Sequence, residues 1–204
     1  LRVMREHGLL VHQRPGAPRG PRAHDGTITT DRVDEMWGTN MTSVATGEGQ
    51  ANVFIAVDHC SAECVGIHAS HLATRHEALE PIRQGVRASF GAFAKEVATG
   101  LKIRHDHGSQ YMSKDFQREI AFLGATSSPA FVRAPEGNGC AERFIRTLKE
   151  NLLWVRWFET IEDLRQALLA FQRTYNQHWI IERHGHRPPA DIRREQTMNI
   201  KQAA

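Results

Sequence analysis

Apolar positions in the first third of the chain fall into the short runs that are typical of β-strands. Three strands are predicted, over residues 36–44, 52–57 and 64–69. The second of them, NVFIAV, is an unbroken apolar run, which indicates a strand buried on both faces. Because the segments TGEGQ and HCSAE between the strands are short and polar, we expect an antiparallel meander.

Helical spacing of apolar residues dominates the rest of the chain. We predict helices over 75–95, 114–123, 140–154 and 161–179, and short strands over 101–105 and 125–128. Ser113 and Thr160 are the expected N-caps of two of these helices. The order β-β-β-α-β-α-β-α-α predicts an α/β domain with a mixed sheet and helices on both faces. It is the element order of the ribonuclease H-like fold.

Basic segments flank this predicted core, which we assign to residues 25–180. Residues 1–24 hold five arginines, three histidines, one acid and three prolines, which predicts the end of a short helix followed by a basic linker. A solvated tail and an arm that contacts phosphates are equally good interpretations of this segment. Residues 181–204 are interpreted as a basic C-terminal tail.

Charge, hydropathy and cysteine content indicate the kind of partner and the cell compartment. The net charge of +3 and the pI near 9.0 fit a polyanionic partner. No run approaches the roughly 18 apolar residues of a membrane span, so no membrane partner is expected. Three cysteines are too few for a disulfide framework, which favours a reducing cytoplasm.

Two acids stand in settings that suit metal-dependent phosphate chemistry. Asp106 follows a short apolar strand and enters a Gly-Ser-Gln-Tyr turn, and Glu142 lies near the start of a helix after a Gly-rich loop. Two Mg²⁺ ions about 4 Å apart can activate the attacking oxygen of a phosphodiester cleavage and stabilise the leaving one. Such ions prefer hard oxygen ligands, so a third carboxylate is expected nearby. For an arbitrary Asp–Glu pair, ordinary surface acids would be the better interpretation.

The residues around these acids resemble a known family. The chain is similar, over about 25–191, to the integrase core of bacterial insertion-sequence transposases, in the group related to retroviral integrases. The resemblance rests on five stretches in consistent order: WGTNMTSV, FIAVDHCSAECVGIH, RHDHGSQYMS, GNGCAERFIRTLKEN and YNQHWIIERHGHRPPAD. The stretch REHGLLV also resembles the end of the helix-turn-helix region that precedes such cores, so the chain is expected to be part of a longer transposase.

The resemblance implies a DDE-type polynucleotidyl transferase that cleaves DNA and transfers strands at insertion-sequence ends. Asp106 aligns with the second acid of its triad and Glu142 with the third, with thirty-five residues between them. The implied cofactor is Mg²⁺ or Mn²⁺ in a two-metal site. The implied partners are element terminal repeats and target DNA, bound by a homo-oligomer that associates with the nucleoid when it is on DNA.

The first position of the triad departs from the family pattern, because Trp37-Gly38-Thr39 is followed by Asn40. An amide is nearly isosteric with a carboxylate but offers one neutral oxygen, so we expect weaker metal binding and impaired turnover. Asp58 is a candidate replacement, although capping of a turn is the better interpretation. The alternative function is a non-catalytic DNA-binding or oligomerising remnant of a decayed transposase.

Lys149 and Arg146 share a helical face with Glu142 and are expected to contact DNA phosphates, with a solvated face as the alternative. Gln110 either contacts DNA or orders its turn. Residues 137–139 (GNG) are expected to form a mobile loop over the site.

Histidines and cysteines near the second hairpin superficially resemble a zinc set, made of His59, Cys60, Cys64, His68 and His71. Their spacing does not match common zinc-finger frameworks, and strand alternation points them to opposite faces, so a zinc site is not expected. His105 and His107 flank Asp106, and packing around the site is a better interpretation of them than general-base catalysis.

Overall fold

The computed structural model describes residues 28–130 and 138–203, which contain one five-stranded sheet of order β3-β2-β1-β4-β5. The expected features of residues 1–24 lie outside the described residues. The strands are β1 (Met36–Thr46), β2 (Gly49–Asp58), β3 (Cys64–Ser70), β4 (Lys102–His105) and β5 (Thr126–Pro129). The first three form the predicted antiparallel meander, and β4 and β5 continue the sheet parallel to β1.

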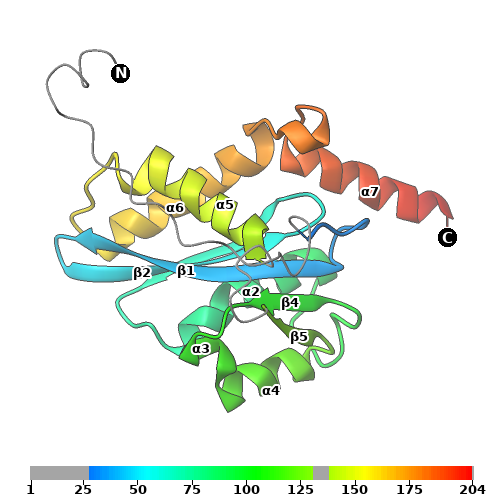
Figure 1. Cartoon of the computed structure of the whole chain (residues 1–204), viewed down its shortest axis with the longest axis horizontal. Coiled ribbons are helices and arrows are strands. Elements are labelled where there is room, and N and C mark those ends of the chain that lie inside the picture. Colours follow the sequence, from blue (N-terminus) through cyan, green and yellow to red (C-terminus); the bar gives the residue numbers. More distant parts are fainter. Residues whose placement is uncertain (1–27, 131–137, 204) are drawn as a thin grey trace, which may run out of the picture.

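Helices cover both faces of this sheet, as expected (Figure 1). One face carries α2 (Arg75–Phe90), α3 (Ser109–Met112) and α4 (Lys114–Phe122), and the other carries α5 (Gly139–Leu148) and α6 (Ile161–His178). Alternate residues of β2 point to opposite cores: Phe54 packs on the α2 side and Ile55 on the α5–α6 side. The apolar run of β2 is therefore buried on both faces, as predicted.

Local sequence signals set most helix ends. The Ser113 hydroxyl accepts a hydrogen bond from the Phe116 N–H at the start of α4, and Thr160 and Asp163 form a capping box at the start of α6. Helix α2 ends earlier than expected, because Gly91 takes a left-handed conformation with φ of 79°.

The helix predicted over 140–154 is divided into two parts. Helix α5 stops at Leu148, and a π-helical turn, η2 (Lys149–Leu153), follows it. Periodicity alone does not distinguish these two kinds of turn over so short a segment. The change in winding shifts the directions of the side chains that follow Lys149.

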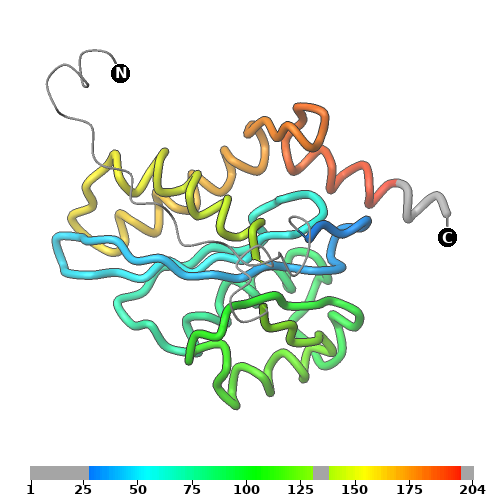
Figure 2. The backbone as a smooth tube through the Cα atoms, viewed as in Figure 1, coloured from blue at the N-terminus to red at the C-terminus, as the bar shows by residue number. Residues whose placement is uncertain are grey.

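The C-terminal segment differs from the predicted basic tail. After a short 3-10 turn, η3 (Glu182–His184), the chain forms α7 (Pro189–Ala203), which packs near α6 (Figure 2). The Ile192 side chain of α7 is buried. None of the helices in the described ranges is both long and apolar enough to span a membrane.

An arginine on α7 holds this helix to the sheet. The Arg193 guanidinium donates to both oxygens of Asp34, at 2.7 and 3.0 Å, and to Glu63, and lies 4.0 Å from Asp58. Burial raises the pKa of Asp58 and of Glu63, and the positive charge of Arg193 opposes that rise. One cation therefore joins α7 to carboxylates from two parts of the sequence, Asp34 before β1 and the pair Asp58 and Glu63 at the turn between β2 and β3.

We predict that Arg193→Leu lowers the free energy of unfolding by about 3 kcal/mol, because it leaves buried carboxylates without their cation. Arg194 is exposed and pairs only with Asp191, three positions earlier on α7. Its replacement, Arg194→Leu, should lower the free energy of unfolding by less than about 1 kcal/mol. Urea denaturation of both variants measures the difference, and equal losses would contradict the prediction. Asp58 and Glu63 have raised pKa values in the folded protein, so they take up protons there more readily than in the unfolded chain as the pH falls. A protonated carboxyl group does not need the charge of Arg193. The loss of unfolding free energy in Arg193→Leu should therefore be smaller at pH 5 than at pH 8.

Candidate active site

The parallel pairing of β1 and β4 brings Asn40 and Asp106 to the same edge of the sheet. The last paired residues are Gly38 and Arg104, and Asn40 and Asp106 each lie two residues farther along their strand directions. Adjacent strands are about 4.8 Å apart, so these two side chains occupy neighbouring positions at the carboxyl ends of the central strands.

Helix α5 brings Glu142 to that same edge through a close approach to β1. The Asn138 side-chain amide donates a 3.0 Å hydrogen bond to the Thr39 carbonyl. A Cβ on Gly38 would lie 2.7 Å from Asn138 Oδ1, 2.8 Å from His59 Nε2 and 3.3 Å from Ala141 Cβ. Glu142 follows Ala141 and is exposed. The start of α5, which carries Glu142, therefore packs against the strand that carries Asn40.

The turn after β4 orients the Asp106 carboxylate. Asp106 Oδ1 accepts a 2.7 Å hydrogen bond from the Gly108 N–H, and the side chain is exposed. The position of a Cβ on Gly108 would lie 2.9 Å from that oxygen and 2.7 Å from Gln110 Nε2, so both side chains pack closely over this glycine. Tyr111 anchors the turn from below, since its ring is fully buried and stacks on His105 at 5.6 Å.

His105 is enclosed beside the site. Its Nδ1 lies 2.6 Å from the Asp106 carbonyl oxygen and its Nε2 lies 2.8 Å from Ser127 Oγ. Burial lowers the pKa of His105, which favours the neutral ring. Both nitrogens are thus engaged in packing the strand ends, as expected, whereas His107 is exposed.

The side chain of Asn40 is bound to the neighbouring backbone. It is half-buried, and its Oδ1 accepts a 2.8 Å hydrogen bond from the Met41 N–H. Among the described residues, no three His, Cys, Asp or Glu side chains come together in a group that could hold a metal ion. Two carboxylates and one amide remain at this edge of the sheet.

Asp58, the candidate replacement acid, accepts hydrogen bonds within its own turn and from the segment before β1. Its Oδ1 accepts from the Ser61 N–H at 2.7 Å and the Ser61 hydroxyl at 2.8 Å, and its Oδ2 accepts from the Asp34 N–H at 2.8 Å. The side chain is fully buried opposite Trp37 of β1. Capping of the turn, the preferred interpretation, is confirmed.

Two of the candidate DNA-contacting residues, Arg146 and Lys149, form a basic strip at the end of α5 and the start of the turn that follows it. Arg146 is exposed on α5, and Lys149 begins the π-helical turn, where its Nζ lies 5.9 Å from the centre of the Trp154 ring. The Gln110 amide folds back over Gly108, which favours a role in ordering the turn.

Residues of the supposed zinc set point to separate partners. His59 Nδ1 contacts the Ile28 carbonyl at 2.8 Å, and His68 Nε2 lies 2.5 Å from Glu77. The Cys64 thiol is buried in the core on the α5–α6 side, where burial raises its pKa.

Sequence reasoning missed the role of Asn138. Residues 137–139 were interpreted as a mobile loop, yet Asn138 is buried and Gly139 begins α5; Gly137 lies outside the described residues. The only signal available was an asparagine just before a helix, which ordinarily predicts an N-cap. No side-chain capping bond is present, and the amide binds β1 instead.

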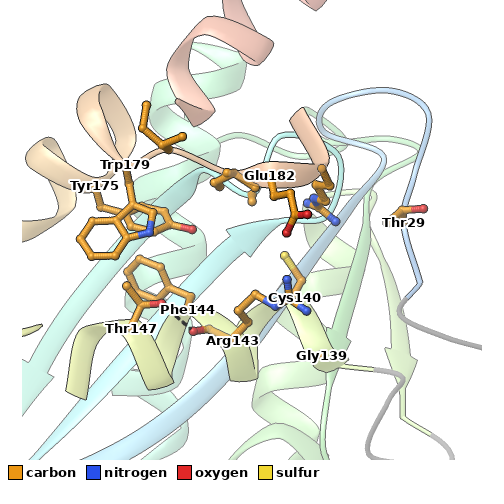
Figure 3. A pocket seen from close by; sticks show the side chains of 13 residues that line it. Thr29, Gly139, Cys140, Arg143, Phe144, Thr147, Tyr175, Trp179 and Glu182 are labelled. Carbon is orange, nitrogen blue, oxygen red and sulfur yellow. Dashed lines mark hydrogen bonds between the residues drawn. The ribbon is translucent and has the colours of Figure 1, made fainter. Parts of the chain in front are cut away.

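A cavity of about 410 Å³ lies between α5 and the end of α6 (Figure 3). Cys140, Arg143 and Phe144 of α5 line it, together with Tyr175 and Trp179 at the end of α6. Asn40, Asp106 and Glu142 are not part of its described lining. The candidate active site is therefore an open edge of the sheet rather than this cavity.

Solved structures with a similar fold are retroviral integrase domains. A chain of the simian T-cell lymphotropic virus intasome, in complex with PP2A regulatory subunit B56 gamma, superposes with a TM-score of 0.61 at 16% identity, over 88% of this chain and 60% of that one. The HTLV-2 integrase catalytic core domain in complex with magnesium gives 0.58 at 17%, over 82% and 99%. These similarities confirm the ribonuclease H-like fold.

Relatives in sequence are transposases of Escherichia coli. Putative transposase InsD for insertion element IS2E is 24% identical over 201 residues, which cover 97% of this chain and 91% of the relative. Transposase InsD for insertion element IS2A/D/F/H/I/K has the same identity, but the chain spans only 66% of its length.

Family profiles match most of the described chain. A profile described as Integrase core domain matches residues 30–135, more than half of the chain, and a second profile of the same description matches residues 124–189. Together they include the two strand ends and the start of α5 that form the candidate site. The chain therefore belongs to the integrase core domain family.

Proposed function

We propose that this chain is the catalytic core of a bacterial insertion-sequence transposase, in which Asn40 impairs metal-dependent DNA cleavage and strand transfer. The observation that supports the proposal is that Asn40 and Asp106 follow the same register of two neighbouring parallel strands, while the start of α5, which carries Glu142, packs against β1. The similarity to InsD transposases supports the substrate class, DNA at the ends of an insertion element.

Asp106 and Glu142 are the proposed metal ligands. Both are exposed carboxylates, and hard oxygen ligands of this kind fit Mg²⁺ or Mn²⁺. A bound divalent cation would activate the attacking oxygen and stabilise the leaving oxygen of the phosphodiester. The neutral Asn40 oxygen supplies no charge to bridge a second cation, so the donor set fits one cation better than two.

The chain's own residues position these ligands. The Gly108 N–H restrains the Asp106 carboxylate, and the Asn138 amide fixes the start of α5, and with it Glu142, against β1. Arg146 and Lys149 follow Glu142 on the same side of the helix, where their charges suit the DNA backbone. Gln110 acts mainly by supporting the turn that carries Asp106.

Assembly of several copies on DNA is part of the proposal. One structural neighbour is a chain of an intasome, a larger assembly than this chain alone. The net charge of +3 is compatible with repeated contacts to a polyanion.

A second candidate function is a non-catalytic DNA-binding or oligomerising remnant. The neutral Asn40 at the first position of the triad favours this function. Asp58 cannot replace it, because the Asp58 side chain is fully buried and both of its carboxylate oxygens accept hydrogen bonds. The fold and the basic strip would persist in such a protein without turnover.

We predict that Asn40→Asp raises Mn²⁺-dependent strand transfer on terminal-repeat DNA at least about tenfold, equivalent to roughly 1.4 kcal/mol of transition-state stabilisation. The restored charge would hold metal beside Asp106. Adding Glu142→Gln to Asn40→Asp is the control and should remove the gain. Equal, robust activity of the parent and Asn40→Asp would contradict the damaging role of Asn40, and inactivity of both would favour the remnant.

Metal affinity provides an independent prediction. Titration calorimetry should give Mn²⁺ binding about tenfold tighter in Asn40→Asp than in the parent chain, because a third formal negative charge would face the cation beside Asp106 and Glu142. Asp31→Asn, an exposed acid outside the site, is the matched control and should leave the affinity unchanged. Identical affinities for the parent and Asn40→Asp would place the metal elsewhere.

A further inference from the structure

Exposed aromatic residues gather where the chain leaves the π-helical turn after α5. Trp154 is 69% exposed, Val155 69% and Trp157 58%. Large apolar side chains that are grouped in this way usually mark an interaction surface, whereas single exposed ones carry no such meaning. The candidate site does not account for them, since they lie beyond the end of α5.

These side chains form one wall of an open groove. Trp154, Val155, Arg156 and Trp157 lie on one side and residues 43–45 of β1 on the other, around a volume of about 520 Å³. Of the described residues that line the groove, one is a cation and none is an acid. The exposed acids Glu150 and Glu159 lie outside that lining.

Cations are placed against the aromatic rings of this segment. Lys149 Nζ lies 5.9 Å from the centre of the Trp154 ring, and Arg156 Cζ lies 5.3 Å from the centre of the Phe158 ring. Contacts at these distances are attractive and hold charge and ring together. The Phe158 ring is buried and holds Arg156 from inside, so the exposed aromatic faces of the groove are those of Trp154 and Trp157, with Lys149 and Arg156 beside them.

The groove continues the strip that starts at the candidate site. Glu142, Arg146 and Lys149 follow one another along α5 and into the π-helical turn, and Trp154 contacts Lys149. At about 1.5 Å per residue, Trp154 lies roughly 15–20 Å from Glu142. Along one DNA strand, with about 3.4 Å per nucleotide, that distance corresponds to about four to six nucleotides.

We propose that Trp154 and Trp157 form a stacking platform for unpaired bases of the DNA strand that crosses the candidate active site. The proposal rests on the proposed function, because it assumes that DNA occupies the strip. Cations that follow a backbone and aromatic faces that receive bases are the combination by which proteins bind single-stranded nucleic acid. The platform would hold a strand that is unpaired about four to six nucleotides from the phosphate at Asp106 and Glu142.

A second copy of the chain is a poorer occupant of the same surface. The core of a protein interface is depleted of charged residues, whereas here Lys149 contacts the Trp154 ring directly and Arg156 lines the groove. A polyanion with flat bases satisfies both the cations and the rings.

Fluorescence anisotropy on the full chain tests the platform with two labelled DNAs. One is a blunt duplex, and the other is a fork of the same duplex with about six unpaired nucleotides. The double variant Trp154→Ala/Trp157→Ala should bind the fork about tenfold more weakly than the parent, the loss expected when base stacking is removed, and should bind the blunt duplex equally well.

Three control variants separate stacking from other effects. Trp154→Phe/Trp157→Phe keeps the flat rings and should retain most of the affinity for the fork. Ile180→Ala removes another exposed apolar side chain, 57% exposed, and should change neither affinity. Arg146→Ala/Lys149→Ala should weaken binding to both DNAs and reduce its salt dependence. All variants should have the same midpoint of urea unfolding as the parent, which shows that they are folded.

Each remaining outcome counts against the platform. Unchanged fork affinity in the double alanine variant, or an equal loss for fork and blunt duplex, would overturn the platform and leave the proposed function intact. A dimer that sedimentation detects in the parent but not in the double alanine variant would assign the groove to a second copy. Failure of the parent to bind either DNA would overturn the platform and the proposed function together.

Discussion

The close approach of α5 to β1 at Gly38 is the constraint on which the candidate site depends. A side chain at this position would collide with Asn138, His59 and Ala141, so a glycine is needed where the helix crosses the strand. The Asn138 amide then joins the helix start to the Thr39 carbonyl, one residue before Asn40. This contact determines how far Glu142 lies from the strand ends.

The approach also explains why buried polar atoms gather beneath the site. His59 Nε2 and Asn138 Oδ1 are buried and have no hydrogen-bond partner among the described residues. His59 Nδ1 must donate to the Ile28 carbonyl, and burial lowers the pKa of the ring, so Nε2 is left as an acceptor. Both acceptors, His59 Nε2 and Asn138 Oδ1, face the α-carbon of Gly38, which offers them no hydrogen bond. The free energy gained by packing α5 on the sheet outweighs the cost of leaving them unsatisfied.

Charge is distributed unevenly between the two ends of the central strands. At the carboxyl end, Asn40 is neutral where the family resemblance calls for an acid, and two exposed carboxylates remain. At the opposite end, Asp34, Asp58 and Glu63 surround Arg193 and hold α7 in place. The acids of this second cluster bind Arg193 and stabilise the fold, so they cannot supply the charge that is missing at Asn40.

The sequence by itself determined the strands and the caps of α4 and α6, because these depend on periodicity and turn residues. The three positions of the candidate triad follow from the family resemblance and stay a prediction. The sequence could not reveal the ordered α7, since the residues that hold Arg193 lie 130 or more positions earlier in the chain. Tertiary structure alone decided the π-helical turn, the inward direction of Asn138 and the exposure of Trp154 and Trp157. These features arise from contacts between segments that the sequence pattern does not bring together.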